Sequence, residues 1–76
     1  MTYNPIAQGA FVATLRKAFR KGFRRRWTDE DGIIYEWDSR HSELEGYDKR
    51  GHHLGAFDAE TGLQIKPSVP GRRIEV

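Results

Sequence analysis

IIYEWDSRHSELEGYDKRGHHLGAF, residues 33–57, is the stretch that decides the fold. Three groups of aromatic, β-branched and other apolar residues favour extended backbone, and two polar runs separate them. The run at 48–51 ends in glycine and is typical of a tight turn, whereas 39–42 is polar and irregular. The stretch therefore predicts three strands in succession, at 33–37, 43–47 and 53–57.

The same pattern extends on both sides of this stretch. Further strands are expected at 26–28, at 63–66 and, as a short edge strand, at 72–76. Turns with a glycine, at 29–32 and 58–62, connect the first two of these to the centre, and the proline-containing run 67–71 interrupts regular pairing. Short strands that follow one another through tight turns indicate an antiparallel meander.

Residues 5–21 carry a different pattern. Asn4 suits the cap of a helix and Pro5 its first position, and apolar residues then recur at spacings of three and four as far as Phe19. The pattern predicts one amphipathic helix over 5–21 that Gly22 ends. Because its apolar stripe needs a surface to pack on, the expected fold is a single α+β domain of residues 1–76, an N-terminal helix packed on an antiparallel sheet of about five or six short strands.

Charge divides the chain into two parts. Residues 1–27 hold seven of the 13 Lys and Arg and none of the 11 Asp and Glu, so residues 28–76 have a net charge of −5. The basic part indicates a polyanionic partner. A solvated basic helix face is the plainer explanation, and an acidic part that meets a basic partner or folds back on the basic segment is a third.

Several kinds of site are excluded or disfavoured. The chain has no cysteine, so it forms no disulfide and no cysteine-based zinc site. His52 and His53 are neighbours and would point to opposite faces of a strand, which makes them a poor pair of metal ligands. No apolar run reaches membrane-spanning length. We expect no membrane-spanning segment, no metal and no small-molecule cofactor.

The centre of the chain gathers acids around one histidine, His41, and one arginine, Arg40. The acids are Glu36, Asp38, Glu43 and Glu45. A ribonuclease that uses the 2′-hydroxyl of RNA as nucleophile needs a base for the hydroxyl proton, an acid for the leaving 5′-oxygen and a cation for the phosphorane. A carboxylate, a histidine and an arginine meet these needs without a metal.

The spacing of these residues predicts which side chains lie on the same face of a strand. On a continuous strand, His41 and Glu45 would share one face, and Asp38 would point away unless 39–42 is a bend that turns it back. The aromatic residues expected on the shared face are Tyr35, Trp37 and Tyr47.

From Arg25 onward the chain resembles the C-terminal cytotoxic ribonuclease domain of the ribosome-inactivating colicins and related bacteriocins. The motifs that carry the resemblance are RRWT at 25–28, IYEWDSRHSELEGY at 34–47, HLGAFDAETGLQIK at 53–66, and a proline-rich link to an arginine near the end. The resemblance implies a strongly twisted antiparallel sheet with an N-terminal helical element. It also implies a metal-independent endoribonuclease that cuts small-subunit ribosomal RNA at the decoding site and so blocks translation.

The resemblance places the family's functional residues on this chain. The catalytic set falls on Asp38, His41, Glu45 and Arg72, with Arg73 as the competing choice for the arginine. We expect Glu45 as general base, His41 as general acid, Asp38 as the group that orients His41, and Arg72 at the phosphorane. The sequence leaves open which of Glu45 and His41 is the base. Substrate binding is expected of Tyr35, Tyr47, Lys66, Arg73, Arg24, Arg25 and Arg26.

Partners and location follow from the same resemblance. It implies the small ribosomal subunit as target, a cognate immunity protein, and action in the cytoplasm of a target bacterium after secretion or delivery as part of a larger toxin. In this scheme residues 1–23 are a basic amphipathic helical segment and 24–76 the ribonuclease sheet. The alternatives are a non-catalytic RNA- or ribosome-binding module with the same fold, and a domain that packs its basic helix on a protein.

Two departures from the family pattern stand out. Ser42 replaces the glycine that follows the family's histidine, so the bend there is expected to differ. Residues 28–76 are acidic where the family's domain is basic, so RNA attraction falls mainly to the N-terminal segment and Arg24–Arg26.

Overall fold

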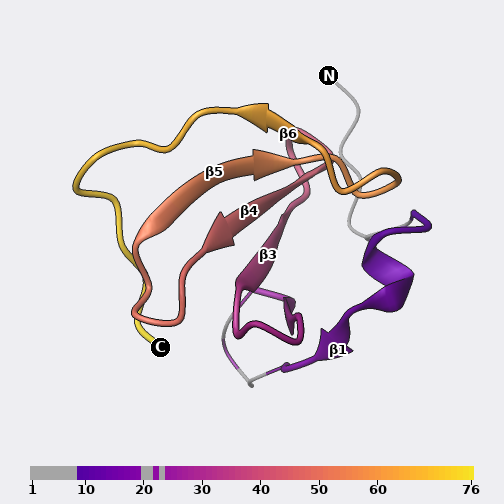
Figure 1. The fold of residues 1–76 in the computed structure, drawn as a ribbon, viewed down its shortest axis with the longest axis horizontal. Coiled ribbons are helices and arrows are strands. Elements are labelled where there is room, and N and C mark those ends of the chain that lie inside the picture. Colours follow the sequence, from indigo (N-terminus) through magenta and orange to yellow (C-terminus); the bar gives the residue numbers. More distant parts are fainter. Residues whose placement is uncertain (1–8, 20–21, 23) are drawn as a thin grey trace.

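The computed structural model describes residues 9–19, 22 and 24–76, and in these residues the chain forms one antiparallel sheet (Figure 1). A single 3₁₀ turn, η1, spans Val12–Thr14. The strands are β1 (Arg16–Lys17), β2 (Arg26–Thr28), β3 (Ile34–Asp38), β4 (Glu43–Tyr47), β5 (His53–Phe57) and β6 (Gln64–Lys66). Each strand pairs with its neighbours in the sequence, so the sheet order is the chain order. The predicted meander is confirmed.

The positions of the predicted strands agree with β2 to β6 within one residue. The edge strand expected at 72–76 is reduced to one isolated bridge between His52 and Arg73. Within the part of the chain that the structure describes, no helix is long and apolar enough to cross a membrane.

The predicted N-terminal helix is wrong, and with it the α+β class. In the described part of 5–21 the chain makes only η1, becomes extended at Leu15 and then pairs as β1 with β2; residues 5–8, 20 and 21 lie outside the described residues. The backbone N–H groups of Phe11 and Val12 donate to carbonyls of Glu60 and Ala59. Contacts with a distant turn therefore outweigh the local helical spacing, which is a weak preference of well under 1 kcal/mol per residue.

Four turns of the sheet begin with an aspartate whose carboxylate accepts backbone N–H groups two to four residues further on. They are Asp29, Asp38, Asp48 and Asp58. An aspartate side chain that bonds its own turn in this way stabilises the reversal locally. Much of the acidity of residues 28–76 thus belongs to the turns between strands.

One face of the sheet carries the hydrophobic core. Its buried residues are Val12, Trp27, Tyr35, Trp37, Leu44 and Ala59. Tyr35 meets the rings of Phe11 and Phe57 edge to face, with centroids 5.4 and 5.6 Å apart. Gly46 leaves room for the Phe57 ring, because a Cβ there would lie 2.4 Å from Phe57 Cε1. From the described N-terminal residues, Val12 belongs to this core and Phe11 and Leu15 pack against it.

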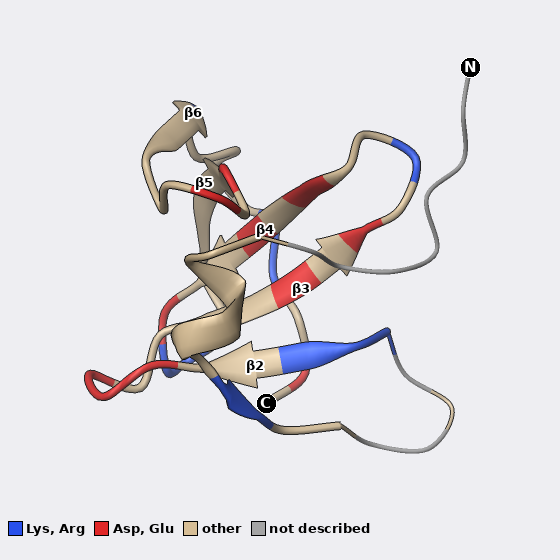
Figure 2. Ribbon diagram, turned by 90° about the vertical axis from the view of Figure 1, so that its right-hand side faces the viewer, with Lys and Arg blue, Asp and Glu red and all other residues tan. Residues whose placement is uncertain are grey.

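The opposite face carries charge. A row of paired residues crosses it from β2 to β6: Arg26, Glu36, Glu45, Ala56 and Lys66. Figure 2 shows the acidic stretches on β3 and β4 and the basic residues of β1 and β2 at the edge of the sheet. Residues 67–76, here called the C-terminal strap, run from β6 past the β4–β5 turn (Figure 1). Hydrogen bonds from Ile74 N–H to Gly51 O and from Arg26 Nη1 to Glu75 O hold the strap.

Candidate active site

A cleft of about 530 Å³ opens on the charged face, between the β3–β4 turn and the strap. All four residues predicted to be catalytic line it, together with Arg24 and Lys66. The β3–β4 connection explains how Asp38 joins them. Asp38 pairs directly with Glu43 across the turn at 39–42, so both carboxylates lie on the face of Glu45. The bend that the sequence left as an alternative is therefore present.

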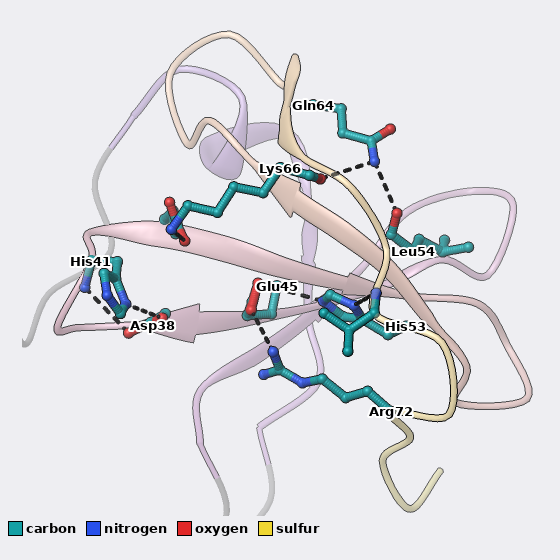
Figure 3. Close-up of polar contacts among 10 residues, drawn as sticks. Asp38, His41, Glu45, His53, Leu54, Gln64, Lys66 and Arg72 are labelled. Atoms are coloured by element: carbon teal, nitrogen blue, oxygen red, sulfur yellow. Dashed lines mark hydrogen bonds and ion pairs between the residues drawn. The ribbon is translucent and has the colours of Figure 1, made fainter.

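Asp38 and His41 form one hydrogen-bonded unit in the cleft (Figure 3). The Nδ1 atom of His41 lies 2.8 Å from Asp38 Oδ2, while Asp38 Oδ1 accepts the N–H groups of Arg40 and His41. Burial alone would raise the pKa of Asp38, but the hydrogen bonds from His41 and the backbone outweigh it and lower the pKa. Half of the His41 side chain is exposed, so its Nε2 edge is available to a ligand.

Ser42 completes the turn in a left-handed conformation, with φ of 53°. It is the one residue other than glycine with positive φ among the described residues. Such a backbone favours glycine, which is the residue that the family pattern has there. The bend thus keeps the glycine-type conformation although the residue is serine.

Glu45 is buried in the middle of β4 and bridges the sheet to the strap. Its Oε1 accepts a hydrogen bond of 2.9 Å from Arg72 Nη1, and its Oε2 lies 3.6 Å from His53 Nε2 (Figure 3). The Arg72 guanidinium also lies over the Tyr47 ring. Burial acts to lower the pKa of Arg72, but Tyr47 and Glu45 raise it on balance. The cleft therefore holds a fixed positive charge beside a buried carboxylate.

Each carboxylate of this face has its own cationic or histidine partner. Lys66 Nζ lies 2.8 Å from Glu43 Oε1, and the hydrogen bond to Glu43 raises the pKa of Lys66. Arg26 donates to Glu36 Oε2 through both Nε and Nη2, at 3.1 and 2.7 Å. Because the acids are paired in this way, their gathering does not amount to an unscreened negative surface.

Metal ligands can be sought in one group among the described residues. Ligand atoms of Asp38, His41 and Glu43 lie within 4.8 Å of one another. However, Asp38 and His41 bond each other, and the Glu43 carboxylate already forms an ion pair with Lys66. These contacts account for the arrangement as two separate hydrogen-bonded pairs, Asp38 with His41 and Glu43 with Lys66.

The residues predicted to bind substrate are divided among several places. Arg24 and Lys66 line the cleft, and Tyr47 lies fully buried beneath Arg72. Arg73 lies outside the cleft, and its backbone forms an isolated β-bridge with His52. Arg72 is therefore the arginine whose side chain reaches Glu45. Three residues point elsewhere: Tyr35 is in the core, Arg26 is buried in its pair with Glu36, and Arg25 lies near the Phe19 ring.

His53 and Glu43 are polar cleft residues that sequence reasoning did not assign to the site. The sequence indicated only that one of His52 and His53 would face inward. Strand parity alone would not have found His53, because Ala56 pairs with Glu45 and regular alternation would put Leu54, not His53, on that face. A register shift between Gly46 and Tyr47 pairs His53 with Tyr47 and so brings it to the face of Glu45.

Fold and cleft define the class of protein: a small antiparallel β domain that sets a histidine–aspartate unit, a buried carboxylate and an arginine around one cleft. The family described as Cytotoxic matches residues 10–75, and the chain belongs to this family, the cytotoxic domains of colicins. The resemblance seen in the sequence is confirmed.

Individual relatives agree with this family. Colicin E3 and cloacin, both from Escherichia coli, are each 55% identical to this chain over 56 residues. Colicin E6 from the same organism is 52% identical over 56 residues. The matches cover 71% of this chain and 10% of each relative, so the chain spans about a tenth of the length of the curated relatives it matches.

Proposed function

We propose that this domain is a toxin endoribonuclease that cuts small-subunit ribosomal RNA at the decoding site and thereby stops translation. The observation that carries the proposal is the meeting of Asp38, His41, Glu45 and Arg72 in one cleft, although they come from β3, a turn, β4 and the strap. Membership of a family of cytotoxic colicin domains supports the same function.

The proposed reaction is a transesterification within the RNA. Glu45 takes the proton of the 2′-hydroxyl, and the resulting oxygen attacks the adjacent phosphorus. Glu45 suits this role because its carboxylate lines the cleft beside Arg72. Arg72 stabilises the charge of the phosphorane. The phosphorus–5′-oxygen bond breaks, and protonated His41 gives its Nε2 proton to the leaving oxygen, which leaves a 2′,3′-cyclic phosphate and a 5′-hydroxyl.

Asp38 supports this chemistry indirectly. Its hydrogen bond to Nδ1 fixes the His41 ring so that Nε2 faces outward. The reverse assignment, with His41 as base and Glu45 as acid, uses the same atoms. A pH–rate profile of single variants distinguishes the two assignments.

The test is cleavage of bacterial ribosomes by the purified protein. We expect one cut near the 3′ end of the small-subunit RNA, with a cyclic phosphate at the new end. His41→Ala and Glu45→Gln should each lower the single-turnover rate by about 10²–10⁴-fold, whereas His52→Ala, on an exposed side chain, should leave the rate unchanged. Full cleavage by a His41→Ala, Glu45→Ala double variant would remove the site assignment, and ribosome binding without any cleavage would favour the non-catalytic alternative.

The partners and the place of action belong to the same proposal. We propose an immunity protein that binds and inhibits the domain, and action in the cytoplasm of a target bacterium after delivery as part of a longer toxin. The support is the family, whose members named above contain the matching segment as a tenth of their length.

A further inference from the structure

His53 is a buried polar residue that the proposed reaction does not use. It is the first residue of β5, and its side chain is 2% exposed, against 53% for the neighbouring His52. Its ring lies beside the Tyr47 ring, with centroids 5.2 Å apart. A buried imidazole is costly unless its nitrogen atoms are bonded, so both ring nitrogens need an account.

The first nitrogen, Nδ1, binds the strap. The N–H of Val69 donates to it at 2.9 Å. A ring nitrogen that accepts a hydrogen bond carries no proton, so the neutral ring carries its proton on Nε2. The strap thereby selects the tautomer of His53.

The second nitrogen, Nε2, points at Glu45. It lies 3.6 Å from Glu45 Oε2, and these two atoms are the buried side-chain atoms without a hydrogen-bond partner among the described residues. One is a donor and the other an acceptor. If the two atoms came about 0.6 Å closer, they would form a normal hydrogen bond. Nε2 can therefore serve as the donor that Oε2 lacks, and Oε2 as the acceptor that Nε2 lacks.

These contacts close a ring of interactions around the cleft. The backbone N–H of His53 donates to Arg72 O at 3.0 Å, and Arg72 Nη1 donates to Glu45 Oε1 at 2.9 Å. Glu45 therefore has His53 at one oxygen and Arg72 at the other. His53 in turn bonds the strap at two places, because its Nδ1 accepts from the Val69 N–H and its own N–H donates to Arg72 O.

We propose that His53 is a positioning residue: its Nε2–H orients the Glu45 carboxylate while its Nδ1 anchors the strap that carries Arg72. The base and the phosphate-binding arginine then reach one substrate in a fixed relation. This inference rests on the proposed function for its catalytic consequence, but the hydrogen-bond assignment stands on geometry alone. A ring that merely fills space would need neither nitrogen.

Two near-isosteric substitutions separate the two nitrogens. His53→Asn keeps an acceptor near the position of Nδ1 and loses the donor toward Glu45, whereas His53→Gln keeps a donor near Nε2 and loses the acceptor for Val69. We expect His53→Asn to lower kcat on ribosomes at least tenfold with KM within about twofold, because a displaced catalytic group costs rate rather than binding. His53→Gln should retain more of kcat but lose hydrogen-exchange protection at the Val69 amide. His52→Asn is the matched control and should change neither.

A second measurement needs no cleavage. Nitrogen-15 NMR of the wild-type protein should show His53 as the Nε2–H tautomer, and the Glu45 carboxyl carbon signal should shift in His53→Asn but not in His52→Asn. An Nδ1–H tautomer, or equal kcat in wild type, His53→Asn and His53→Gln, would overturn the inference. If the wild-type protein does not cut ribosomes while the NMR signatures appear, the proposed function fails and the His53–Glu45 contact stands. Should both variants unfold, the wild-type tautomer still decides the contact.

Discussion

At the scale of single residues, the cleft illustrates how acids can serve a site that we propose to bind RNA. Asp38 caps its turn and holds His41, Glu43 holds Lys66, and Glu45 holds Arg72. Each carboxylate thus fixes the cation or imidazole that would face the phosphate. Pairing also keeps the negative charge local, since opposite charges a few ångström apart largely cancel at a distance.

Tyr35 allows a prediction about pH. Burial, followed by the charge of Asp29, raises its pKa from 10.0 to about 12. A group whose pKa is raised by folding stabilises the folded state fully below the unfolded pKa and loses this contribution as pH rises through the folded pKa. The free energy of unfolding should therefore fall between about pH 10 and 12. Tyr35→Phe, which keeps the ring in the core, should remove roughly 2 kcal/mol of that fall.

The measurement is urea unfolding of both proteins at pH 8 and at pH 11–12. Tyr47, whose pKa burial also raises, contributes to both curves, so the difference between them isolates Tyr35. Parallel curves would show that Tyr35 ionises as freely in the folded protein as in the unfolded one.

At the scale of elements, the start of β2 (Arg26–Thr28) shows how three similar residues are separated. Arg24, Arg25 and Arg26 are consecutive, and all three were expected to bind RNA. Arg24 reaches the cleft, and Arg25 lies exposed near Phe19. Arg26 is buried against Glu36 on β3 and holds the strap at Glu75 O. Arg26 therefore serves the fold, whereas Arg24 and Arg25, which precede β2, stay exposed.

This division predicts different effects for Arg25 and Arg26 on stability. Arg26→Ala leaves the buried Glu36 carboxylate without its partner and should lower the free energy of unfolding by about 3–5 kcal/mol. The double change Arg26→Met, Glu36→Leu removes both charges and should cost much less. Arg25→Ala, at an exposed position, should stay within about 0.5 kcal/mol of wild type. Chemical denaturation checks all three, and an Arg26→Ala protein as stable as Arg25→Ala would contradict the structural role.

At the scale of the whole molecule, the charge division of the sequence becomes a division of surfaces. Four exposed basic residues belong to β1 or directly precede β2, and they are here called the basic edge: Arg16, Lys17, Arg24 and Arg25. The segment that leads into this edge belongs to the fold, because Val12 is buried in the core and bonds Ala59. Deleting the segment would remove positive charge and also disrupt the core, so the two effects on ribosome binding could not be told apart. Point substitutions of the exposed basic residues change the charge alone.

The basic edge should contribute salt-dependent binding to ribosomes. Changing Arg16, Lys17, Arg24 and Arg25 to Gln, singly and together, should weaken binding and reduce the slope of log K against log salt by about 0.7 for each phosphate that is no longer neutralised. The control is Lys49→Gln with Arg50→Gln, in the exposed β4–β5 turn. Titrations at several salt concentrations measure the slopes. Equal slopes for the edge variants and the turn control would exclude a phosphate role for this edge.

Much of the fold was predictable because it depends on neighbours in the chain. Alternation of apolar and polar residues, β-branched and aromatic side chains, and turns with Asp and Gly place β2 to β6 within one residue. The quoted motifs also led to the family that the comparisons confirm. The sequence by itself therefore determined the meander, its turns and the family.

The tertiary structure decided what depends on residues far apart in the chain. Contacts of Phe11 and Val12 with Glu60 and Ala59 turned an expected helix into a 3₁₀ turn and a strand. The path of the strap places Arg72, and not Arg73, beside Glu45. Packing between distant segments also buries Arg26 against Glu36 and brings His53 next to Glu45. Local patterns specify where strands and turns lie, but only packing between distant segments specifies what a side chain meets, because those contacts form when the chain closes on itself.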